Sequence, residues 1–190
     1  MRSIFFCGAF VGALIIASLM QNGLWQSHSF MLGVAHPLLG VDHLLVMIAV
    51  GLWAAVIGRR GIWILPVTFL ATMLAGFAAA SFGLNIPLVE PVILSSIVAL
   101  GVLVALAVQA RVWLGALIIG SFAFFHGHAH GTEAAAVSLT SYAIGFTLST
   151  ATLHAIGIGL GILAAGSIRE VALRAMGGIT ALIGLALMVI

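Results

Sequence analysis

Long apolar runs separated by short polar breaks dominate the chain and predict a bundle of membrane-spanning helices. Beyond residue 35, six such runs follow one another, each of about 20 residues, the length that an α-helix needs to cross a bilayer core of about 30 Å. The breaks are short and rich in glycine, proline or arginine. We expect helices over residues 36–58, 61–82, 90–110, 112–130, 137–166 and 170–190.

A shorter apolar run precedes these six. It lies between Arg2 and the polar pair Gln21-Asn22, an arrangement typical of a secretory signal peptide. The small residues of a good cleavage site are missing, so a retained anchor helix is the alternative. We therefore divide the chain into residues 1–27, a signal peptide or N-terminal anchor helix, and residues 28–190, a single six-helix transmembrane domain.

The composition indicates a protein that lies in lipid. Of the 190 residues, 64% are hydrophobic and only 5% are charged, whereas a soluble domain carries about 25% charged residues. The predicted fold class is an all-α integral membrane protein, a six-helix transmembrane bundle preceded by an N-terminal signal-like or anchor helix. The net charge of +2 comes from a few arginines and says nothing about nucleic acid, and we expect no nucleic-acid partner. A single cysteine, Cys7, excludes an internal disulfide and a thiolate metal cage.

Arginines recur in alternate connections between the predicted helices. Arg59 and Arg60 lie between the first and second, Arg111 between the third and fourth, and Arg169 and Arg174 around the last connection. Positive charge marks the cytoplasmic side of a membrane protein. We expect these connections to face the cytoplasm, in a multi-pass protein of the bacterial inner membrane.

An unusual polar stretch opens the first of the six runs. His36, Asp42 and His43 place three ionisable groups within eight residues. A charge at the centre of a membrane helix costs about 2.5–3.5 kcal/mol on insertion scales, so such groups mark functional sites. Pro37 favours a helix start here, and on one helix the two histidines would face nearly the same way. Two imidazoles and a carboxylate suggest ion handling.

A second cluster, Phe125–Glu133, ends the fourth predicted helix. On a helix His126, His130 and Glu133 would form one stripe, while His128 would point away. Two histidines one turn apart can share a metal ion. A solvated, glycine-rich outer loop is the alternative interpretation.

A helix rises about 1.5 Å per residue. By this measure both clusters lie about 22–34 Å from the arginine-bearing connections, at a similar depth in the membrane and toward the periplasm. Glu90 and His154 fall at this level too, although Glu90 could instead stabilise its helix dipole and His154 could bond to a neighbouring helix. His28 lies outside this layer, as a surface residue or, near a cleaved N-terminus, as a further metal ligand.

Two motifs resemble those of a known family. His36-Pro37…Asp42-His43 and Phe125-His126-Gly127-x-Ala129-His130-Gly131-x-Glu133 resemble the signatures of the HupE/UreJ family of nickel/cobalt permeases. Leu88-Val89-Glu90-Pro91 and Leu153-His154-x-x-Gly157 are similar to later motifs of that family, and the likeness covers residues 30–190.

This resemblance implies import of Ni²⁺ or Co²⁺ for hydrogenase or urease maturation or for cobalamin synthesis. Nitrogen and carboxylate ligands alone would also suit Zn²⁺ or Cu²⁺. The resemblance implies metal-handling roles for His36, Asp42, His43, Glu90, His126, His130 and Glu133. Weaker candidates are His128, His154 and His28.

We therefore expect a metal transporter and not an enzyme, with no tightly bound cofactor. Its partners would be the divalent ion and the bilayer, and a homo-oligomer remains open. No nucleotide-binding motif appears in the sequence, so an ion gradient, the membrane potential or a partner would drive transport. The rival interpretation is an intramembrane zinc-dependent hydrolase, in which three histidines hold Zn²⁺ and a carboxylate activates water. A bis-histidine haem protein is a third.

Overall fold

The computed structural model describes residues 23, 27–134, 138–163 and 166–189, and all the regular structure within these ranges is helical. The all-α prediction is thus confirmed. Most of the predicted signal or anchor segment lies outside the described residues. The helices are a first helix, Ser27–Leu39, followed by α2 (Val41–Ile57), α3 (Gly61–Ser81), α4 (Val89–Ala105), α5 (Val112–Glu133), α6 (Leu139–Leu163) and α7 (Gly166–Leu187).

Several helices have the length and composition of membrane spans. Four helices qualify, namely α3, α5, α6 and the Glu170–Leu187 part of α7. The first helix and α2 form a fifth candidate if they are one broken span, and α4 is apolar but has only 17 residues. The chain is a membrane protein, and six separate spans remain a prediction.

The structure corrects the expected first helix, residues 36–58. The chain breaks at Gly40, where the first helix and α2 meet at a bend of 77°. Gly40 donates its backbone N–H to the His36 carbonyl over 3.1 Å, which completes the first helix before the chain turns. Pro37 lies inside that helix and does not begin one. His36 and His43 therefore lie on two different helices and not on one face of a single helix.

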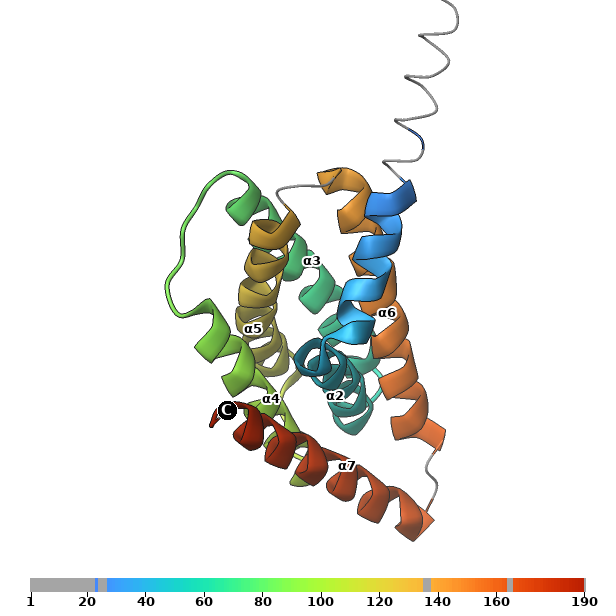
Figure 1. Ribbon diagram of the computed structural model, residues 1–190. Helices are drawn as coiled ribbons and strands as arrows, with labels where there is room; N and C mark the ends of the chain where they lie inside the picture. The colour runs from blue at the N-terminus through green and yellow to red at the C-terminus, as the bar shows by residue number, and fades with distance from the viewer. Residues whose placement is uncertain (1–22, 24–26, 135–137, 164–165, 190) are drawn as a thin grey trace, which may run out of the picture.

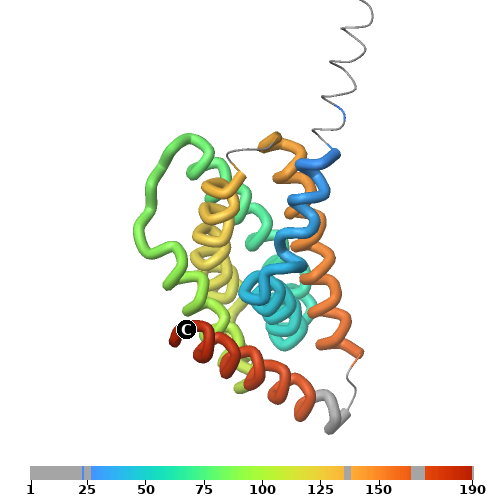
Figure 2. Tube along the Cα trace, viewed as in Figure 1, coloured from blue at the N-terminus to red at the C-terminus, as the bar shows by residue number. Residues whose placement is uncertain are grey.

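Helix α2 occupies the middle of the bundle. It is seen nearly end-on in Figure 1, and α3, α4 and α6 pack against it. Almost all of α2 from Val46 onward is buried, including Trp53, which donates from its indole N–H to the Val108 carbonyl over 3.0 Å. In Figure 2 the first helix runs beside α6, while α7 lies across α4. This arrangement holds the start of α2, with its polar residues, inside the protein.

Helices α3 and α5 approach so closely that their backbones touch. A Cβ at Gly127 of α5 would overlap the Met73 carbonyl of α3, and a Cβ at Gly76 of α3 would overlap the Phe124 carbonyl of α5. Small residues allow this approach between membrane helices, where tight packing is a main source of stability. The contact fixes the histidine-bearing end of α5 against α3.

We predict that Gly127→Ala destabilises the folded protein, because its methyl group would require the α3 backbone to move. Overpacking of this kind typically costs about 1–3 kcal/mol, so the midpoint of thermal unfolding in detergent should fall. Gly178→Ala in α7 is the matched control, since a Cβ there meets nothing within 4 Å. An equal loss of thermal stability in both variants would contradict the close contact.

Candidate metal centre

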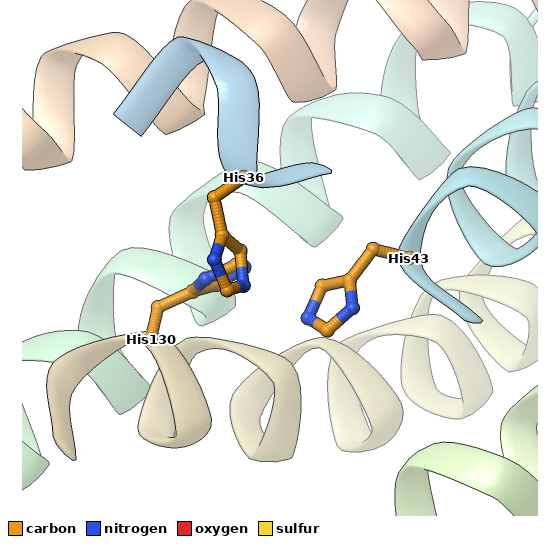
Figure 3. A group of neighbouring side chains, drawn as sticks. All are labelled: His36, His43 and His130. Atoms are coloured by element: carbon orange, nitrogen blue, oxygen red, sulfur yellow. The ribbon is translucent and has the colours of Figure 1, made fainter. Parts of the chain in front are cut away.

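Three histidines from three helices meet where the chain bends. His36 lies in the last turn of the first helix, His43 in the first turn of α2 and His130 in the last turn of α5. Each offers a ring nitrogen, and these three atoms lie within 4.8 Å of one another. Figure 3 shows the His43 ring pointing toward the other two rings. We call these residues the histidine triad.

The triad is compact enough to bind one ion after small side-chain movements. The ring centroids of His36 and His130 are 4.7 Å apart, and those of His43 and His130 are 4.8 Å apart. Metal–nitrogen distances of about 2.0–2.1 Å place ligand nitrogens about 3–3.5 Å from one another. Rotations of the three side chains can close the remaining gap.

Two carboxylates flank the triad, each beside one of its histidines. Asp42 Oδ2 lies 2.9 Å from Nδ1 of His43, and Glu133 Oε2 lies 3.2 Å from Nε2 of His36. A carboxylate next to a ligating histidine orients the ring and raises its basicity. Both acids also bring negative charge that would offset the charge of a bound cation.

Buried imidazole nitrogens in this region lack hydrogen-bond partners. Within the described ranges, Nε2 of His43, both ring nitrogens of His130 and Nε2 of His126 make no hydrogen bond. Leaving a buried polar group unpaired costs about 1–3 kcal/mol. The lone pair of a neutral imidazole nitrogen is also the electron pair that a metal ion binds. The unpaired nitrogens therefore fit metal coordination better than they fit packing.

His126 extends the triad inward along α5. Its ring lies 5.4 Å from that of His43 by centroid distance. Its Nδ1 lies 2.9 Å from the carbonyl of Phe122, the residue one turn earlier. When Nδ1–H donates this bond, the lone pair is left on Nε2, the arrangement usual for metal-binding histidines.

His128 makes a different contact, although it lies between His126 and His130 in the sequence. It is buried, its Nε2 lies 2.7 Å from the Leu84 carbonyl in the connection between α3 and α4, and its Nδ1 has no hydrogen-bond partner among the described residues. This bond ties the connection to α5. The cluster is helical through Glu133 and largely buried, so the solvated-loop interpretation is wrong.

The structure leaves other predicted residues outside the triad. Glu90 lies exposed in the first turn of α4, where it makes no ion pair or hydrogen bond with any residue that the structure describes. His28 is exposed on the first helix. His154 is buried in α6, and its Nδ1 lies 2.8 Å from the Met47 carbonyl of α2. Metal-binding roles for these three residues remain predictions.

Two aromatic residues of α6 that do not stand out in the sequence line the site. Phe146 stacks on His130, with centroids 4.7 Å apart and an interplanar angle of 12°, and Tyr142 lies 6.3 Å from His36. Their only sequence signal is the four-residue spacing, which puts both on one helix face. Gly40 lies close to the site as well, since a Cβ there would sit 3.0 Å from Asp42 Oδ1.

This centre combines neutral nitrogen ligands, adjacent carboxylates and partial access. The side chains of His36 and Glu133 are 30% and 54% exposed, whereas His43 and His130 are buried. An ion could therefore reach His36 first and then the buried imidazoles. Such ligands suit a borderline divalent transition metal and not Mg²⁺ or Ca²⁺, which prefer oxygen ligands.

Comparison with known proteins agrees with this chemistry. The family described as "HupE / UreJ protein" matches residues 9–187. Protein HupE of Rhizobium leguminosarum bv. viciae is 41% identical over 158 residues, which cover 83% of each chain. No solved structure matches the chain. The chain belongs to the HupE/UreJ family, the family of nickel/cobalt permeases that its histidine motifs resemble.

Proposed function

We propose that this protein imports Ni²⁺ or Co²⁺ through the histidine triad and supplies the ion to nickel enzymes or to cobalamin synthesis. The observation that carries the proposal is the set of three imidazole nitrogens within 4.8 Å, contributed by three helices of a membrane protein. Membership of the HupE/UreJ family supports metal transport as the use of this centre.

The triad has the features of a transient binding site. Its ligands come from separate elements and include one partly exposed residue, His36. A transported ion must be bound well enough to enter and weakly enough to leave. The break at Gly40 also resembles the interrupted helices that form ion sites in other transporters, where irregular backbone lines the site. These features favour a carrier over a structural metal site.

The arginines give the direction of transport in this proposal. Arg59 and Arg60 follow α2 and Arg111 precedes α5, so they lie at the helix ends remote from His43 and His130. By the positive-inside rule that end faces the cytoplasm, and the triad opens toward the periplasm. Inward movement of a dication through an inside-negative potential gains about 4.6 kcal/mol per 100 mV, twice the value for one charge.

An intramembrane zinc hydrolase would also use three histidines and a nearby carboxylate. Family membership makes this interpretation the less favoured one. The two functions differ in how firmly the metal is held. Stoichiometric Zn²⁺ that survives purification would support the enzyme, whereas weak binding and counterflow of radiolabelled Ni²⁺ in liposomes would support the transporter.

We predict that the double variant His43→Ala/His130→Ala abolishes uptake of ⁶³Ni²⁺ by cells that depend on this protein. It removes two of the three triad ligands, and even the loss of an outer-shell partner typically costs about 10–100-fold in metal affinity. Glu170→Gln is the control, since that carboxylate pairs with Arg174 on the exposed side of α7, away from the triad. Wild-type uptake by a correctly inserted double variant would refute the proposal.

We further predict that Asp42→Asn weakens Ni²⁺ binding to the purified protein by about 10–100-fold, because the His43 ring loses the charge that orients it and raises its basicity. Competition with a chromogenic chelator in detergent measures the affinity. Glu170→Gln is the matched control, since that carboxylate pairs with Arg174 on the exposed side of α7. Equal affinities in both variants would show that Asp42 does not support the site.

A further inference from the structure

His154 is buried on the inner side of the triad and has one ring nitrogen without a partner. Only 1% of the residue is exposed. Its Nδ1 lies 2.8 Å from the carbonyl of Met47, the residue one turn beyond His43 on α2. Among the described residues, nothing forms a hydrogen bond with its Nε2. The bond at Nδ1 leaves the lone pair on Nε2, as it does in His126.

A row of rings connects the triad with His154. The His126 ring contacts His43 of the triad, and the Phe69 ring of α3 contacts both His126 and His154, at centroid distances of 5.8 and 4.9 Å. Two unpaired Nε2 atoms, those of His126 and His154, thus lie on residues that share one aromatic neighbour. The row runs from the bend toward the arginine-bearing end of the bundle.

Further polar atoms accompany this row. Thr150 lies one turn before His154 on α6, and its hydroxyl is 4.0 Å from Sδ of Met73, which lies one turn beyond Phe69 on α3. Ser149 Oγ is buried and has no hydrogen-bond partner within the described part of α6 or its neighbours. A thioether such as that of Met73 can act as a further soft ligand for a metal ion that imidazole nitrogens bind. Burying a hydroxyl costs free energy unless the group is hydrogen-bonded, and Ser149 has no such bond to any residue that the structure describes.

Next to His154, α2 and α6 close against each other. A Cβ at Gly51 of α2 would overlap the His154 carbonyl, and a Cβ at Gly157 of α6 would overlap the Ile48 carbonyl. The two backbones therefore meet without side chains between them. An ion that reached His154 would be held at the inner end of the polar row until these helices separate.

From these contacts we infer that His154 forms a second, inner metal position, which receives the ion from the triad by way of His126 before its release. The inference rests on the proposed transport function. The imidazole ligand of this position is the unpaired Nε2 of His154, whereas Nε2 of His126 would bind the ion in passing, and the ion is the same borderline divalent transition metal. The Nδ1 bond to Met47 holds the His154 ring in place, as a supporting bond does for other metal-binding histidines.

The variant His154→Asn tests this position against a purely structural role of His154. The asparagine amide can still donate a hydrogen bond near the position of Nδ1, so the link between α2 and α6 is kept, whereas the Nε2 ligand is lost. His128→Gln is the matched control, because it likewise keeps a donor, to the Leu84 carbonyl, at a buried histidine outside the row. Each full-length protein is measured for Ni²⁺ affinity in detergent and for ⁶³Ni²⁺ uptake into proteoliposomes.

We expect His154→Asn to leave the Ni²⁺ affinity of the triad unchanged and to lower uptake by about tenfold or more, the size of effect usual for a disturbed metal site. His128→Gln should behave like wild type. Wild-type uptake by His154→Asn would overturn the inner position, and so would a joint loss of triad affinity and uptake, which would indicate a structural role. If the wild-type protein itself carried no Ni²⁺, the proposed function would fail instead.

Discussion

A buried imidazole has two ring nitrogens, and each one that lacks a partner raises the free energy of the folded protein. The contacts of the buried histidines in the centre of the bundle reflect this cost. His126, His128 and His154 each use one nitrogen on a backbone carbonyl. In the described part of the chain, most of the ring nitrogens that remain unpaired belong to the triad, His126 and His154, and Nδ1 of His128 is unpaired as well. Their desolvation would be offset if a metal ion took the free lone pairs. The same cost explains why carboxylates lie beside His36 and His43.

Histidine therefore makes two kinds of contact in this bundle. His128 fixes a connection, and its direction away from the triad follows from its bond to Leu84. His126 bonds to its own helix, and unlike His128 it also has a ring contact with His43 of the triad. Close packing at glycines holds these rings in place, because it leaves α3 and α5 no room to slide past each other.

Sequence reasoning could predict much of this arrangement, since apolar runs define helices and the spacing of His126 and His130 defines a helix face. It failed at the bend, because Pro37 reads as a helix start and Gly40 lies inside an otherwise continuous apolar run. The number of residues between a side chain and the nearest arginine predicts its depth in the membrane, but it does not predict which neighbouring helix the side chain faces. For this reason Glu90, at the predicted level, could not be told apart from residues of the triad, and Phe146 could not be foreseen as their neighbour.

The bend at Gly40 has a mechanical consequence. His36 and His43 stand on opposite sides of a junction of one residue, so any change in the 77° angle between their helices alters the separation of their nitrogens. In the proposed function the geometry of ion binding would therefore depend on the position of the first helix, which itself packs closely on α6, since a Cβ at Gly33 would overlap the Tyr142 carbonyl. A shift of the first helix along α6 would move the His36 ring relative to those of His43 and His130, which belong to other helices.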